Sequence, residues 1–142
     1  MVRAVIARLG AIALVTGLAV VALPATPGAD AATYQPWGRA SASDKVLRPG
    51  CRNYQFIYRI DPPGDEWAAE VFLSSRGKGL ASRAFASNAD PARGRSSFRL
   101  CRQSVTYGTF KIRMKITYRK GYYENGEGWV RPTYFRMVRP RR

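Results

Sequence analysis

The chain has 142 residues, with 24 Lys and Arg against 9 Asp and Glu, which gives a formal net charge of +15. This length and charge are typical of one modest basic domain. Histidine is absent, which excludes Ser–His and Cys–His catalytic pairs and a histidine general base, so we expect no enzymatic activity. The sequence contains neither a P-loop nor a dinucleotide-binding fingerprint, so we expect no cofactor.

The first 32 residues are typical of a secretory signal peptide. Two arginines precede an uncharged run of 15 residues at 9–23, which is shorter than the roughly 20 residues that a membrane-spanning helix needs. Small residues at 29–31 suit a signal peptidase. We therefore predict cleavage after Ala31 or Ala32 and an extracellular location. An uncleaved membrane anchor is the alternative.

The rest of the chain alternates apolar and polar residues in short segments between turn signals, which predicts an all-β domain over 46–138. Residues 33–45 are weakly patterned and are expected to form an extended arm or an edge strand, and residues 139–142 a basic tail. From 74 to 97 we expect a single short strand with loose connections. The predicted strands are 53–60, 66–74, 80–86, 97–101, 109–119 and one within 129–138.

Two connections carry particular signals. The turn at 61–66 contains two prolines and a glycine. Its carboxylates, Asp61, Asp65 and Glu66, could contribute to a calcium site, but acidic residues are ordinary at turns and the spacing matches no EF-hand, so we expect no metal. In the predicted loop 120–128, Asn-Gly at 125–126 is a strong hairpin-turn signal.

Cys51 and Cys101 are the only cysteines, and both follow the predicted cleavage site. An oxidising destination makes a disulfide the expected state. The bond would enclose 49 residues, for which the chain-entropy model gives a stabilisation of about 4 kcal/mol. Two buried free thiols are the alternative. A metal site has less support, because the chain offers only these two thiols and no histidine.

The order of the predicted strands resembles an immunoglobulin-like β-sandwich of about seven antiparallel strands, over roughly 46–138. In that family a strand-B cysteine, a strand-C tryptophan and a strand-F G-x-Y-x-C motif meet in the core. Here Trp67 would be the tryptophan, 108–112 would replace the motif, and Phe56 would replace the first cysteine. The inter-sheet disulfide of the family is missing, and Phe110 lacks the hydroxyl of the family's tyrosine.

The same resemblance implies where the two cysteines would lie. Cys51 precedes the segment that would be strand B, and Cys101 ends the segment that would be strand E. In the family these strands are antiparallel neighbours, so the start of one lies opposite the end of the other. A disulfide within one sheet would then be geometrically reasonable.

The strand at 109–119 separates apolar from cationic side chains. If its apolar residues face the core, the intervening cations face outward. The resemblance would place the last strand beside it, so that Tyr134 and Arg136 join the same face. The predicted anion-binding residues are Lys111, Arg113, Lys115, Arg119, Tyr134 and Arg136.

Arginine forks bind anionic oxygens and aromatic rings stack on bases or sugars, so this face would suit an anionic polymer. Arginine outnumbers lysine 19 to 5, a bias that favours a G+C-rich bacterial source. Teichoic acid, another envelope polymer or extracellular nucleic acid are therefore the expected partners. A charged face that serves only solubility is the alternative.

The loop 120–128 offers a second kind of site. Tyr122, Tyr123 and Glu124 would form a recognition tip for a protein partner, as in an inhibitor module, because tyrosine gives a large contact area at small entropic cost. The alternative is that Tyr122 and Trp129 close the end of the core. A secreted hydrolase that works without histidine is a third reading of the chain.

Overall fold

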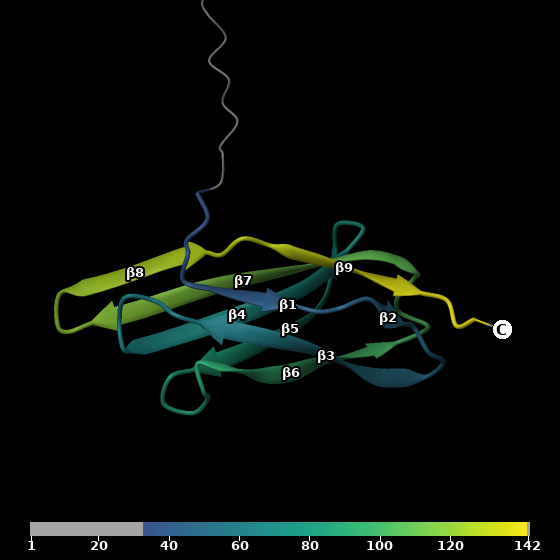
Figure 1. The fold of residues 1–142 in the computed structure, drawn as a ribbon, viewed down its shortest axis with the longest axis horizontal. Helices are drawn as coiled ribbons and strands as arrows, with labels where there is room; N and C mark the ends of the chain where they lie inside the picture. The colour runs from purple at the N-terminus through teal and green to yellow at the C-terminus, as the bar shows by residue number, and fades with distance from the viewer. Residues whose placement is uncertain (1–32, 142) are drawn as a thin grey trace, which may run out of the picture. The chain divides into compact units, whose positions relative to one another are not determined.

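The computed structural model describes residues 33–141, so the predicted signal peptide lies outside the described residues. The described part is all-β, as predicted, and contains no helix (Figure 1). It therefore includes no helix that could cross a membrane. The strands are β1 (Gly38–Ser41), β2 (Lys45–Val46), β3 (Cys51–Ile60), β4 (Glu66–Ser75), β5 (Lys78–Ala86), β6 (Arg93–Cys101), β7 (Gly108–Lys120), β8 (Glu124–Trp129) and β9 (Thr133–Val138).

These strands form two sheets (Figure 1). The smaller sheet has the order β1-β3-β6, and the larger has the order β2-β9-β7-β4-β5. Strand β7 is long enough to pair with β9 along its first half and with β8 along its second half. Every pairing is antiparallel except that of β2 with β9. The predicted arm thus supplies β1 to one sheet and leads into β2 of the other.

The inward side chains of both sheets form one hydrophobic core. Phe56 on β3 stacks on Phe98 of the neighbouring strand β6, with ring centroids 4.4 Å apart. Phe85 of the larger sheet lies 4.2 Å from the ring of Tyr58 on β3, so aromatic contacts join the two sheets. Burial, and then the nearby carboxylate of Asp90, raise the pKa of the Tyr58 hydroxyl above its usual value.

The alternation predicted for β7 is present. Phe110, Ile112, Met114 and Ile116 are fully buried. The cations between them remain partly or fully exposed on the outer face of the larger sheet. Because side chains along a strand point to opposite faces in turn, this burial fixes the direction of each cation.

The disulfide between Cys51 and Cys101 is formed, as predicted. The two cysteines are the first residue of β3 and the last residue of β6, and they lie directly opposite each other with Cα atoms 3.9 Å apart. Both strands belong to the smaller sheet, so the bond links neighbours within one sheet. Outside the bond, the Arg102 amide donates to the Gly50 carbonyl at 2.9 Å.

The prediction of a loop over 120–128 is wrong. Strand β7 continues to Lys120, the turn occupies only 121–123, and residues 125 and 126 lie inside β8. Gly126 faces Tyr118 across the hairpin, and a Cβ on this glycine would lie 2.5 Å from Cε1 of the tyrosine ring. Trp37 packs edge-on against the same ring at 5.0 Å. The glycine therefore makes room for an aromatic ring rather than forming a turn.

We predict that Gly126→Ala lowers the free energy of unfolding by about 1–3 kcal/mol, because the tyrosine ring must move away from the new methyl group. Gly79→Ala is the matched control, since a Cβ on this strand glycine meets no atom within 4 Å. Urea unfolding of both variants measures the difference. Equal stability of the two variants would show that the ring does not require the glycine.

Candidate functional site

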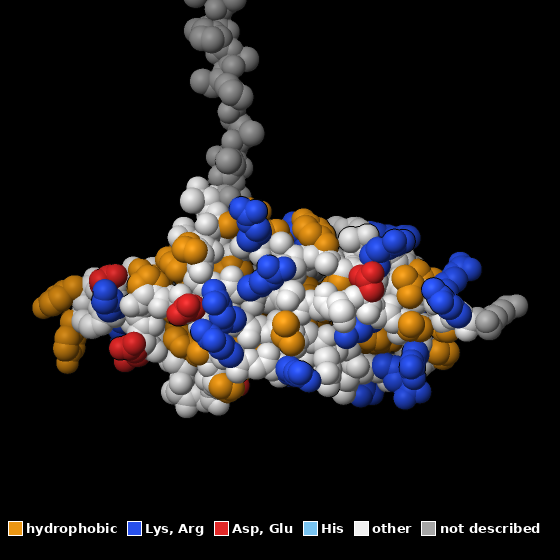
Figure 2. Space-filling model, viewed as in Figure 1, with side chains coloured by type: hydrophobic (Ala, Val, Ile, Leu, Met, Phe, Trp, Pro, Cys, Tyr) orange, Lys and Arg blue, Asp and Glu red, His pale blue; other side chains and the backbone are white. Residues whose placement is uncertain are grey.

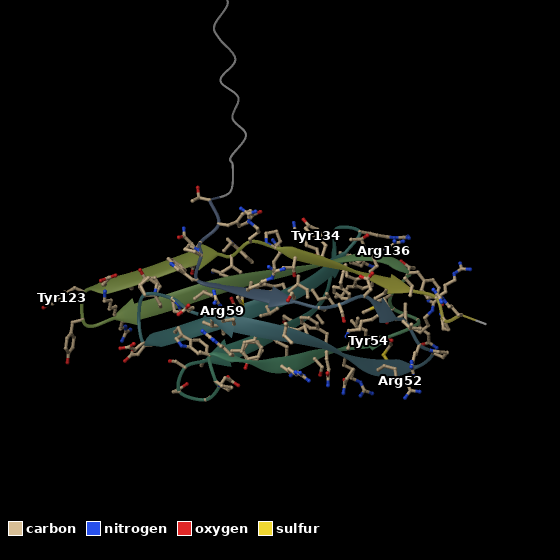
Figure 3. The ribbon with its side chains drawn as sticks, viewed as in Figure 1. Arg52, Tyr54, Arg59, Tyr123, Tyr134 and Arg136 are labelled. Carbon is tan, nitrogen blue, oxygen red and sulfur yellow. A yellow bond between two sulfur atoms is a disulfide. The ribbon has the colours of Figure 1, made fainter. Side chains whose placement is uncertain are left out.

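The outer face of the larger sheet brings the predicted anion-binding residues onto adjacent strands. Lys111 lies opposite Tyr134 of β9, and Arg113 lies opposite Phe72 of β4. Figure 3 labels Tyr134 and Arg136 along β9. In the view of Figure 2, β1 and β3 of the smaller sheet lie in front of the larger sheet, and Lys and Arg side chains are spread over the face in view, with Asp and Glu mostly toward the end where β7 and β8 meet. The pairings therefore gather cations on the outer face of the larger sheet, along β7 and β9.

A hollow of about 780 Å³ lies on this face, where the β4–β5 hairpin meets β7 and β9. Three cations line it, Arg76, Lys111 and Arg113, together with several hydroxyl groups and two aromatic rings. None of its lining residues is Asp or Glu. The full lining is Phe72, Leu73, Ser74, Ser75, Arg76, Gly77, Gly79, Leu80, Ala81, Ser82, Thr109, Lys111, Arg113 and Tyr134.

Aromatic rings orient two of the three cations. The Arg113 guanidinium lies 4.8 Å from the centroid of the Trp129 ring, and the Lys111 ammonium lies 5.8 Å from that of Tyr134. The Trp129 ring is in turn 5.8 Å from that of Phe72. Contacts of this kind hold a cation in place while leaving its hydrogen-bond donors available to a ligand.

The wall of the hollow is fixed by hydrogen bonds between its strands. The Ser75 hydroxyl donates to the Thr109 carbonyl at 2.8 Å, which ties the end of β4 to the start of β7. The Ser74 hydroxyl donates to the Lys111 carbonyl at 3.5 Å. The cations therefore project from a braced part of the sheet.

Arg76 is a lining residue that sequence reasoning missed. It forms a two-residue hairpin turn with Gly77, and both residues have positive φ angles, 51° and 76°. Only glycine adopts this conformation freely, and an arginine there costs roughly 1–2 kcal/mol. The sequence predicts loose connections after residue 74 and no tight turn at this site. The actual signal was the glycine of a two-residue connection between strands.

The other two predicted cations of β7 lie outside the hollow and face carboxylates. Lys115 Nζ is 2.9 Å from Glu127 Oε1 of β8, and Arg119 Nη1 is 3.7 Å from Glu66 Oε2 of β4. Their charges are partly offset, whereas no ion pair among the described residues involves Lys111 or Arg113. The predicted row of cations is thus two different regions of one strand.

Arg136 lies beside the hollow. It is opposite Thr109, which lines the hollow, and its side chain is exposed. Its backbone amide donates to Asp44 Oδ1 at 2.7 Å, which ties β9 to the segment before β2. Arg136 can therefore extend the cationic surface, but the hollow does not include it.

The tip of the β7–β8 hairpin is the second predicted site. Tyr122 and Tyr123 are 96% and 99% exposed, and their ring centroids are 6.5 Å apart. Glu124 pairs with Lys120 at 3.7 Å. Trp129 lies on the outer face of the sheet, so the alternative in which Tyr122 and Trp129 close the core is wrong. Figure 3 shows Tyr123 projecting from the hairpin tip.

Within residues 33–141, no group of three or more His, Cys, Asp or Glu side chains is arranged to hold a metal ion. The acidic turn at 61–66 is included in that range.

Comparison of the chain with models of protein families, with curated proteins and with solved structures found no match. The geometry of the surface is therefore the basis for inferring function.

Proposed function

We propose that this chain is an exported, non-enzymatic module that binds an anionic polymer bearing phosphate groups, such as teichoic acid or nucleic acid. The observation that carries the proposal is the hollow, which is lined by three cations and by no carboxylate. Arginine forks and the lysine ammonium bind phosphate oxygens, and neighbouring hydroxyl groups can donate further hydrogen bonds. The disulfide fits an oxidising compartment, which supports export.

We further propose that the domain is an immunoglobulin-like sandwich. The smaller sheet corresponds in order to strands A-B-E of that family, and the larger sheet to A′-G-F-C-C′. Phe56 and Ile112, which would replace the two family cysteines, are both buried, and Trp67 packs against the core. The disulfide departs from the family because it lies within the smaller sheet.

Steep salt dependence is the expected sign of polymer binding by this surface. Each neutralised phosphate releases counterions, so three contacts contribute a slope of about −2 to −3 in a plot of log affinity against log salt concentration. Titrating a labelled single-stranded oligonucleotide between about 50 and 200 mM salt measures the slope. A flat response would remove the proposal.

Protein recognition at the hairpin tip is a second candidate function. It is favoured by the almost complete exposure of Tyr122 and Tyr123, which makes both rings available to a partner. This candidate predicts saturable binding to one protein, lost on Tyr123→Ala and little changed by Arg113→Ala.

A further inference from the structure

The outer face of the smaller sheet carries a second group of cations, which the sequence did not bring to notice. Five exposed arginines project from its three strands on the side away from the core. We call this surface the arginine face. Its arginines are Arg39 of β1, Arg59 of β3, and Arg93, Arg95 and Arg99 of β6.

Strand pairing places three of these arginines in one row. Arg39 lies directly opposite Arg59, and Arg59 lies directly opposite Arg93. Neighbouring strands are about 4.8 Å apart, so the row spans roughly 10 Å across the sheet. Arg95 and Arg99 continue the positive surface along β6. Figure 3 labels Arg59, the central member of the row.

The arrangement lowers stability unless an anion offsets it. Like charges directly opposite one another on adjacent strands repel. The ion pairs found among residues 33–141 involve none of the five arginines. Their outward neighbours are uncharged, namely Ser41, Cys51, Asn53, Gln55, Ile57, Ser97 and Cys101. A repulsive cluster without an internal partner is typical of a binding surface.

Protection of a sheet edge can account for Arg39 and Arg93, which lie on the edge strands β1 and β6, but it does not explain Arg59. Arg59 lies on β3, which is the central strand of the smaller sheet. The edge strand β6 is already covered in part by another residue, because Arg83 Nε of β5 donates to the Ser97 carbonyl at 2.9 Å. Charges that block edge pairing are needed on edge strands and not at the centre.

We propose that the arginine face binds a second chain of a phosphate polymer, so that one domain holds two chains on the outer faces of its two sheets. This inference rests on the proposed function of the hollow for the first chain. Guanidinium forks bind phosphate oxygens in pairs. The outward residues of this face include no aromatic ring on which a base could stack. The polymer is therefore recognised by its phosphates alone.

The test uses inorganic polyphosphate, which has no bases, in a two-chain capture assay. Biotinylated polyphosphate is fixed to a surface, the protein is added, and fluorescent polyphosphate follows. The two polymers repel each other, so fluorescence on the surface requires a protein that holds both. We expect the native protein to capture the second chain.

Three triple variants, each lacking three positive charges, separate the faces. Arg39→Gln/Arg59→Gln/Arg93→Gln should still bind the fixed chain and lose at least tenfold of second-chain capture. Arg76→Gln/Lys111→Gln/Arg113→Gln should behave in the same way, through the other face. The control removes exposed arginines that belong to neither surface, Arg48→Gln/Arg52→Gln/Arg141→Gln, and should keep capture near the native level.

The outcomes distinguish the two proposals. If the first variant captures as well as the control, the arginine face is not a site and this inference is overturned. If the second variant captures normally, the proposed role of the hollow fails instead. If the first variant loses capture of an oligonucleotide but not of polyphosphate, the arginine face recognises bases. Recognition by phosphates alone, and with it the inference, is then overturned. Urea unfolding of the first variant should occur at an equal or higher midpoint, because repulsion has been removed.

Discussion

Replacing Cys51 and Cys101 together by serine should lower the free energy of unfolding by about 4 kcal/mol. The bond joins residues separated by 50 positions, so its loss frees a long loop in the unfolded chain. Small domains are stable by only about 5–15 kcal/mol, and this domain buries only about two thirds of its unfolded surface. The disulfide therefore supplies a large share of the stability.

The effect should arise in the unfolded state and not from lost native contacts. The cysteines occupy the end of the smaller sheet, where Cys51 is exposed and hydrogen bonds continue beyond the bond. Urea unfolding of the double variant should show a steeper dependence on urea as well as a lower midpoint, because a chain without the cross-link exposes more surface. Reduced native protein is the control and should match the variant. A loss below about 1 kcal/mol would contradict the chain-entropy account.

The sequence predicted the features that depend on the local alternation of apolar and polar residues. Alternation over two residues identified the inward face of β7, because a strand can bury only every second side chain. The disulfide was also predictable, since the sequence predicts export and two cysteines in an oxidising compartment are expected to form a bond. These inferences needed no knowledge of which strands are neighbours.

The features that were missed depend on neighbours from distant parts of the chain. Lys115 and Glu127 meet only because β7 pairs with β8 in a particular register, which no local pattern specified. Gly126 imitates a turn signal although its role is to accommodate Tyr118 from the facing strand. The arginine face needed three strands in register, and the first part of β6 had been assigned to a loose connection.

The largest expected effect on binding comes from Lys111→Gln/Arg113→Gln. Each substitution removes a charge-assisted contact to phosphate worth roughly 1.5–3 kcal/mol, so affinity at low salt should fall about a hundredfold or more. The salt slope should become shallower by about 2, one for each cation. The measurement is made in the background of the triple variant Arg39→Gln/Arg59→Gln/Arg93→Gln, so that the affinity reports binding at the hollow and not at the arginine face.

The matched control is Lys115→Gln/Arg119→Gln, which removes the same charge from the same face of the same strand. These two cations are already paired with Glu127 and Glu66, so their loss also frees two carboxylates, but neither cation lines the hollow. If the polymer is held in the hollow, the control should weaken binding far less than the hollow variant, and Tyr123→Ala should leave it unchanged. Equal losses in both double variants would mean that the whole strand attracts the polymer as a diffuse field, and that the hollow has no special part in binding.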